Sequence, residues 1–266
     1  MREMTPEEVR KVQLEILDVV TEFCDEHGIK YWLDSGTLIG AVRHKGYIPW
    51  DDDIDLGMLR PDYDKFRESF NQKNSRYYFA CGENSRDFFA AYGKVLDTNT
   101  VLFEPDINGY KLSVNIDVFV YDNAPDDDMI VKEMFDRRDL LRRLSGYRNL
   151  DWINESDSLL KRFVKSIVIS VLDVFPQDYF IKKMVQNTKK YKDVATKRIG
   201  NFTAYSRTVC DIHAFDETVA MEFEGKMYKV PIGWDKWLTA MYGNYMELPP
   251  LEKRVTHHSY VAYCEE

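Results

Sequence analysis

Apolar residues repeat at helical spacing near the start of the chain and predict a long N-terminal helix. Its start is Thr5-Pro6-Glu7-Glu8, with Thr as the N-cap, Pro at the first helical position and Glu three residues after the cap. The apolar positions of the repeat are Val9, Val12, Ile16, Val19, Val20 and Phe23. Gly28 suits the C-terminal cap of this helix.

Short runs of β-branched and aromatic residues predict strands in much of the remaining chain. These runs lie at residues 29–33, 53–58, 77–81, 88–96, 111–121, 201–210 and 218–230. Shorter helices are predicted at residues 37–44, 61–70 and 234–242. An acidic, turn-rich stretch at 122–128 predicts a break, and Leu248-Pro249-Pro250 is expected to end the packed region.

The middle of the chain changes character, with basic amphipathic helices predicted at residues 129–144, 158–175 and 177–191. Residues 137–192 hold 13 lysines and arginines against 6 aspartates and glutamates, a net charge of +7, whereas the rest of the chain carries −16. We therefore expect an α/β (α+β) fold, in which residues 1–128 and 197–266 form the core. Residues 129–196 are expected to form a basic helical insertion on the acceptor or membrane side.

The segment at 158–175 allows two interpretations. Its wide apolar stripe consists of Leu159, Leu160, Phe163, Val164, Ile167, Val168, Val171 and Leu172. Lys161, Arg162 and Lys165 lie at one end. Such a helix can pack in the core of the insertion or lie on an anionic membrane, and we favour the core.

The totals exclude several classes of protein. The chain has 266 residues and a formal charge of −9, which argues against nucleic acid as a partner. The cysteines lack a CxxC pair, so zinc spacing is absent and a reduced, cytoplasmic protein is expected. The charged N-terminus does not resemble a signal peptide, and no apolar run approaches the roughly 20 residues of a spanning helix.

Four aspartates at positions 51, 52, 53 and 55 are the first candidate for chemistry. On a strand at 53–58 successive side chains face opposite ways, so Asp53 and Asp55 share a face. Asp51 extends this row, whereas Asp52 has the opposite parity and is interpreted as structural. Two carboxylates about 7 Å apart along a strand suit a divalent cation that also binds phosphate oxygens.

A third carboxylate is expected on a neighbouring strand, where Asp117 alternates with apolar residues in SVNIDVF. The alternative is that these are surface aspartates on an edge strand. Upstream, Gly36-Thr37 lies between a strand and a helix, where backbone N–H groups can meet a phosphate. A strand, a Gly-Thr turn, a helix and an Asp-x-Asp strand in this order resemble the nucleotidyltransferase arrangement of polymerase-β-like enzymes.

Residues 36–58, GTLIGAVRHKGYIPWDDDIDLGM, resemble the signature of the LicD family, which the fukutin-related proteins share. A second similarity covers FEGKMY at 223–228, the helix at 234–242 and YGNYMELPP at 242–250. The two regions bracket almost the whole chain. The resemblance implies a nucleotidyltransferase-like mixed sheet flanked by helices.

The resemblance also implies a reaction: transfer of phosphocholine from CDP-choline to a glycan hydroxyl, on teichoic acid precursors or lipopolysaccharide. The implied partners are CDP-choline and a glycan acceptor. The amphipathic segment at 158–175 adds the expectation of a lipid-linked acceptor and of peripheral contact with the inner face of an anionic membrane. Mg²⁺ or Mn²⁺ is expected on Asp51, Asp53, Asp55 and Asp117. The catalytic residues are then Asp53, Asp55 and Asp117, with Asp117 able to accept the proton of the sugar hydroxyl.

The substrate-binding residues expected from these arguments are Gly36, Thr37, Arg43, His44, Tyr47, Trp50, Lys94, Glu224 and His257. Gly36 and Thr37 would contact phosphate. Lys94 matches a family lysine that touches phosphate, and otherwise is an ordinary strand lysine. One residue of Arg43-His44-Lys45 is expected to meet the nucleotide, or the three neutralise the acidic row.

A choline headgroup is a quaternary ammonium, which proteins hold against aromatic faces. Tyr47 and Trp50 are the aromatic candidates, with core packing as the alternative. Glu224 would serve the metal or the headgroup. His257 and His258 would close over the site, or belong to an ordinary surface.

Other functions remain open at this stage. The donor can instead carry ribitol phosphate or glycerol phosphate, as the fukutin-like relatives suggest. A third enzymatic reading is nucleotide transfer onto a small molecule. A non-enzymatic alternative is a catalytically inactive binding module. The three aspartates at 53, 55 and 117 argue against it, because an inactive protein has no need for buried like charges.

Overall fold

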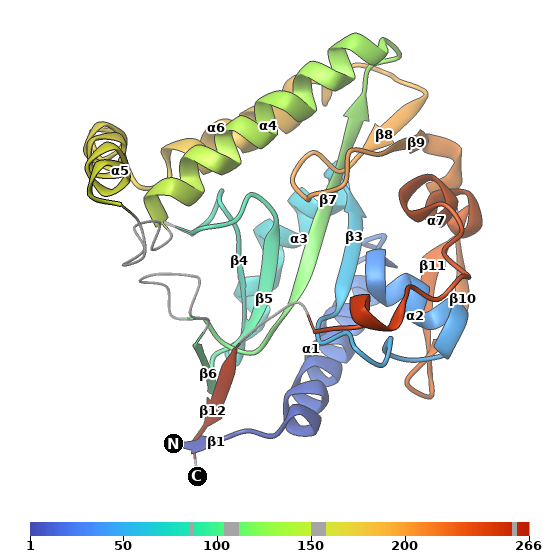
Figure 1. Cartoon of the computed structure of the whole chain (residues 1–266). Helices are drawn as coiled ribbons and strands as arrows, with labels where there is room; N and C mark the ends of the chain where they lie inside the picture. The colour runs from blue at the N-terminus through green and yellow to red at the C-terminus, as the bar shows by residue number, and fades with distance from the viewer. Residues whose placement is uncertain (86–87, 104–111, 150–157, 257–259, 266) are drawn as a thin grey trace.

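The computed structural model describes residues 1–85, 88–103, 112–149, 158–256 and 260–265 (Figure 1). A mixed sheet runs through the centre of the molecule in the order β2-β3-β7-β5-β4. Its strands are β2 (Trp32–Leu33), β3 (Asp55–Leu59), β7 (Asn115–Ala124), β5 (Gly93–Asp97) and β4 (Tyr77–Ala80). β3 and β7 are parallel, and the other neighbours are antiparallel. The expected α/β class is confirmed.

Two helices, α1 (Pro6–Glu26) and α3 (Arg60–Lys73), pack on the sheet and on each other. Phe23 of α1 meets Phe66 and Phe70 of α3 with ring centroids 5.8 and 5.1 Å apart. The predicted capping box of α1 is present, because Glu8 N donates to Thr5 Oγ1 and Thr5 N donates to the Glu8 carboxylate. The local sequence therefore sets where the first helix begins.

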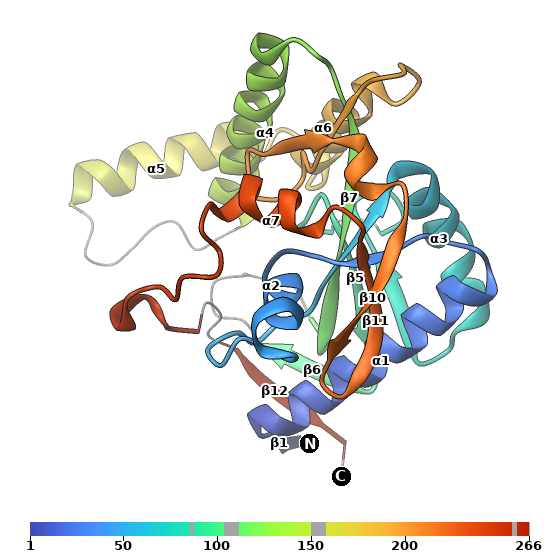
Figure 2. The ribbon, with the colours of Figure 1, turned by 90° about the vertical axis from the view of Figure 1, so that its right-hand side faces the viewer.

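The helical segment follows β7 as α4 (Asp128–Asn149), α5 (Leu159–Leu172) and α6 (Tyr179–Thr188), with a 3₁₀ turn at Lys189–Tyr191. α4 and α6 lie side by side at one end of the sheet, and α5 projects away from the body in both views (Figures 1 and 2). That these helices form a separate domain stays a prediction. In the part of the chain that the structure describes, no helix has the length and apolar content to cross a membrane.

The last third of the chain contains β8 (Arg198–Gly200), β9 (Val209–Asp211), the hairpin β10 (Thr218–Phe223) and β11 (Lys226–Pro231), and α7 (Trp234–Tyr242). It also has 3₁₀ turns at Ile212–Phe215 and Leu251–Lys253. The expectation that packing ends near Leu248 is wrong. β12 (Val261–Cys264) returns to pair between β1 (Arg2–Glu3) and β6 (Thr100–Phe103), and so brings the two chain ends together (Figure 1).

Three local predictions also differ from the structure. The break expected at 122–128 starts later, since β7 continues to Ala124 and buries Asp122 against Arg60. The strand expected at 88–96 is confined to Gly93–Asp97. The run at 201–210 is mostly irregular chain between β8 and β9. A tertiary contact sets the first of these boundaries, whereas local turn hydrogen bonds, Phe88 N to Ser85 O and Ala204 N to Asn201 Oδ1, occupy the other two stretches.

The core interpretation of the 158–175 segment is also wrong. Leu172 is the one buried residue of α5, and most of its apolar stripe faces solvent. The apolar pattern could not show which side of the helix meets the protein.

Candidate active site

Three neighbouring strands place charged side chains opposite one another. Asp55 of β3 lies opposite Asp117 of β7, and Lys94 of β5 lies opposite Asp117 from the other side. The Asp117 amide donates to Ile54 O at 2.8 Å, which extends the pairing one residue before β3 begins. Side chains opposite each other across a ladder are neighbours, so the strand register assembles this centre.

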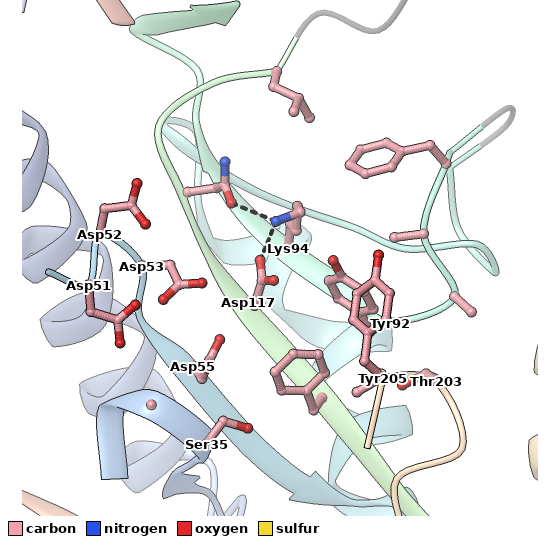
Figure 3. Close-up of a pocket in the computed structure, with 18 of the residues that line it drawn as sticks. Ser35, Asp51, Asp52, Asp53, Asp55, Tyr92, Lys94, Asp117, Thr203 and Tyr205 are labelled. Carbon is pink, nitrogen blue, oxygen red and sulfur yellow. Dashed lines mark hydrogen bonds and ion pairs between the residues drawn. The ribbon is translucent and has the colours of Figure 1, made fainter. Parts of the chain in front are cut away.

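The centre opens into a cavity of about 850 Å³ (Figure 3). The carboxylates that line it are those of Asp51, Asp52, Asp53, Asp55 and Asp117. Among the lining residues, all within the described chain, Lys94 and Arg142 carry the positive charges. Five carboxylates against two cationic side chains leave an excess of negative charge that a bound cation would balance.

Helix α2 (Ser35–His44) begins at the cavity. A Cβ on Gly36 would come within 2.6 Å of Asp51 Oδ2, so glycine allows the acidic loop to approach the helix start. The hydroxyl of Thr37 accepts the Asp55 amide at 2.8 Å. Thr37 therefore holds the beginning of β3 and does not line the cavity. Ser35, with φ +48°, lines it instead.

The sequence pattern emphasises the Gly-Thr pair and does not single out Ser35, which precedes it. The sequence signal for Ser35 is a serine next to a glycine at a strand-to-helix turn. Asp34, the N-cap of α2, is fully buried and accepts Tyr121 Oη at 2.5 Å and Trp237 Nε1 at 3.0 Å. Burial raises the pKa of Asp34. These contacts tie the start of α2 to β7 and α7.

The acidic loop before β3 carries the metal-binding potential. Carboxylate oxygens of Asp51, Asp52 and Asp53 all lie within 4.8 Å of one another. Strand parity does not govern these residues, because β3 begins only at Asp55. The expectation that Asp52 stands apart is therefore corrected: it lines the cavity with its neighbours.

Helix α1 fixes the path of this loop through the backbone. Arg10 donates to Asp51 O at 2.9 Å, and Gln13 donates to Asp52 O at 2.8 Å. The carbonyl groups are thereby held toward the helix while the carboxylates line the cavity (Figure 3). Nothing in the local sequence of the loop indicates these two partners.

Burial and neighbouring negative charges destabilise the ionised form of Asp55. Its pKa is raised well above the ordinary value, first by burial and then by Asp53 and Asp117. A buried carboxylate among other carboxylates, on an oxygen-rich wall, fits a hard divalent cation such as Mg²⁺ or Mn²⁺. The donor set therefore agrees with the predicted metal site.

Lys94 is in the cavity, but its ammonium is engaged by the protein. Lys94 Nζ forms a close ion pair with Asp117 Oδ1 and donates to Asn115 Oδ1 at 3.0 Å. The lysine thus balances part of the charge on Asp117 and orients its carboxylate.

The aromatic residues of the cavity are mostly not those that the sequence suggested. Trp50 lines the cavity, whereas Tyr47 is buried against Phe223. The Tyr47 hydroxyl donates a hydrogen bond to Gln13 Oε1 at 3.0 Å. Further aromatic lining comes from Phe89, Tyr92, Phe119, Tyr205, Tyr242 and Tyr260. Figure 3 shows Tyr92 and Tyr205 on the side opposite Asp51–Asp53.

Among the described residues, the predicted substrate residues Arg43, His44 and Glu224 lie outside the cavity lining. Arg43 donates to Tyr245 O at 2.7 Å and to His44 Nε2 at 2.9 Å, and Lys45 pairs with Glu222 at 3.0 Å. Burial lowers the pKa of His44, and Arg43 adds to this effect.

Glu224 occupies the tip of the β10–β11 hairpin with φ +50°, where its carboxylate accepts the Tyr47 amide at 3.0 Å. There it secures the loop that leads to the aspartates. His257 and His258 fall outside the described residues.

The fold and the acidic site agree with the class that a family model assigns to residues 28–142: "LicD/FKTN/FKRP, nucleotidyltransferase domain". Lipopolysaccharide cholinephosphotransferase LicD of Haemophilus influenzae is 31% identical over 271 residues, which cover 99% of each chain. The chain belongs to the LicD family, as the sequence predicted.

Two human relatives share shorter regions. Ribitol 5-phosphate transferase FKRP is 54% identical over 35 residues, 13% of this chain and 7% of that protein. Ribitol-5-phosphate transferase FKTN is 29% identical over 112 residues, 42% of this chain and 21% of that protein.

Proposed function

We propose that this protein transfers phosphocholine from CDP-choline to a hydroxyl of a cell-surface glycan precursor, and that CMP is released. The acceptor is a lipopolysaccharide or teichoic acid precursor. The observation that carries the proposal is the cavity itself, which joins five carboxylates on one side to aromatic rings on the other. Full-length similarity to a cholinephosphotransferase supports the choice of headgroup.

The acidic wall would hold Mg²⁺ or Mn²⁺ through Asp51, Asp53, Asp55 and Asp117. Asp52 belongs to the same loop, and its carboxylate lies within 4.8 Å of those of Asp51 and Asp53. A bound divalent cation neutralises charge on the transferred phosphoryl group and on the departing CMP. The first turn of α2 lines the cavity at Ser35 and Gly36 and would place the positive end of the helix dipole near a bound phosphate.

Asp117 is the proposed base for the acceptor hydroxyl. Its carboxylate lies in the cavity between the acidic loop and Tyr92 (Figure 3). Lys94 holds one carboxylate oxygen, Oδ1, and so fixes the direction in which the other can accept a proton.

The headgroup is proposed to lie against Tyr92, next to Phe119, whose ring centroid is 4.9 Å away. Replacing Tyr92 by Leu is expected to raise the KM for CDP-choline about 5- to 30-fold, because the aromatic face is worth roughly 1–2 kcal/mol to a desolvated cation. Steady-state kinetics check this, with Tyr78→Leu on the outer surface of β4 as the matched control. An unchanged KM would place the headgroup elsewhere.

Transfer of ribitol phosphate is the second candidate, favoured by the names of the two human relatives and by polar groups in the cavity. Arg142, Ser145 and Thr203 place polar side chains on the wall, and a polyol is recognised by groups of this kind. Comparison of kcat/KM for CDP-choline, CDP-ribitol and CDP-glycerol separates the candidates. A preference for a polyol donor would overturn the choline assignment but keep the acidic site.

Release of CMP from CDP-choline in the presence of a glycan acceptor is the direct test. We expect EDTA to stop CMP release and Mg²⁺ or Mn²⁺ to restore it, since five carboxylates otherwise face one another in the cavity. Omission of the acceptor is the control. Absence of CMP release from every CDP-linked donor would favour an inactive binding module, and pyrophosphate release from a nucleoside triphosphate would favour nucleotide transfer.

A further inference from the structure

The outer side of α5 is a large exposed apolar surface in the described part of the helical segment. Leu160, Phe163, Ile167 and Val171 are 73%, 64%, 49% and 58% exposed. Their spacing of three or four residues places them on one side of the helix. Leu159 and Val164 widen this side and are also exposed. We call these six residues the outer face of α5.

The opposite side of the same helix already contacts the protein. Lys165, Val168, Ile169 and Leu172 are the partly or fully buried positions, and they follow the same helical spacing. The helix therefore has two apolar sides, of which packing uses one. Among the described residues the outer face does not contribute to the core, and an exposed apolar face of this kind is typical of a surface that binds a partner.

The charges around the outer face indicate which partner fits. Lys161 and Arg162 are exposed on the same helix, in a region with a net charge of +7 within a chain of −9. A symmetric pairing of two copies through the outer face would bring their two basic regions together, where they repel, whereas anionic lipid headgroups attract lysine and arginine. We propose that α5 lies in the plane of an anionic bilayer, with its outer face among the acyl chains and the basic residues at the headgroups.

The position of α5 relates this surface to the cavity. Arg142 and Ser145 of α4, and Ile181 and Met184 of α6, line the cavity, and α5 connects those two helices in the chain. In both views α5 projects away from the body at the ends of α4 and α6 (Figures 1 and 2). A bilayer bound there would present a membrane-anchored acceptor beside the cavity. That last step rests on the proposed function, but lipid binding by α5 does not.

Vesicle co-sedimentation of the full chain tests the proposal without substrate or turnover. We expect sedimentation with vesicles of phosphatidylglycerol and phosphatidylcholine at low salt, and little with phosphatidylcholine alone. Phe163→Glu combined with Ile167→Glu is expected to weaken binding at least tenfold with unchanged thermal unfolding, because both residues are exposed. Met227→Glu, on the exposed hairpin strand β11, is the matched control and should bind like the wild type.

Substitution of the basic residues of α5 tests the electrostatic part of the proposal. Lys161→Gln with Arg162→Gln is expected to weaken binding to the anionic vesicles roughly 10- to 30-fold and to flatten its salt dependence. Failure of the wild type to sediment at low salt, or equal binding by the Phe163→Glu/Ile167→Glu variant, would overturn the proposal. So would a dimer in light scattering that this variant dissociates, since the outer face would then belong to a second copy. CMP release measured on a water-soluble acceptor reports separately on the proposed function.

Discussion

The Asp55→Asn variant is expected to lose turnover while its metal-free form becomes more stable than the wild type. Asp55 is buried beside Asp53 and Asp117, and burial and these charges raise its pKa well above 3.8. The amide removes a buried like charge but keeps the shape of the side chain. A gain of 1 kcal/mol in the free energy of unfolding raises the melting temperature by about 2–4 °C for a chain of this size.

The same substitution is expected to reduce CMP release by roughly 10²- to 10³-fold, because a bound cation contributes several kcal/mol of charge stabilisation in the transition state. It should also abolish the rise in melting temperature that Mn²⁺ gives the wild type. As the pH falls through the raised pKa, Asp55 of the folded wild type takes up a proton and loses its buried charge. The stability advantage of the variant should therefore shrink as the pH approaches 3.8.

Thermal unfolding with EDTA and with Mn²⁺, together with a CMP assay, measures all of these effects. Asp126→Asn, at an exposed aspartate, is the matched control and should change none of them. Full turnover in Asp55→Asn, or an unaltered response of its melting temperature to Mn²⁺, would contradict the metal site.

The Asp122→Ala variant is expected to destabilise the fold by about 3–5 kcal/mol. Asp122 is buried and accepts two hydrogen bonds of 2.7 Å from Arg60, which also donates to Thr188 at 3.0 Å. This pair joins α3, β7 and α6 at the base of the helical segment. The Arg60 side chain is only 8% exposed. Removal of the Asp122 carboxylate therefore leaves a buried guanidinium without its closest acceptor.

Urea denaturation measures this loss. Asp64→Ala is the matched control, because Asp64 is partly exposed and lies 3.6 Å from the same guanidinium, so its loss should cost less than about 1 kcal/mol. Replacing both partners, Arg60→Met with Asp122→Leu, should recover much of the stability, since no buried charge is left alone. Equal losses for Asp122→Ala and Asp64→Ala would show that the buried pair is not the main connection.

The sequence alone determined the features that depend on neighbouring residues. The capping box at Thr5 and Glu8 set the start of α1, because both partners lie within one helical turn. The family signature at 36–58 identified the acidic segment, and the apolar alternation around Asp117 placed that residue on a strand. Local spacing thus gave most of the regular elements, the family and the principal carboxylates.

Contacts between distant residues decided the rest, because the chain pattern does not contain them. Arg10 and Gln13 of α1 hold the carbonyls of the acidic loop, so Asp52 joins its neighbours in the cavity although strand parity excluded it. Tyr92 and Tyr205 become cavity residues only when β5 and the chain before β9 reach the same wall. The exposure of the apolar stripe of α5 likewise followed from its packing, since a helical pattern defines a face but not the partner that covers it.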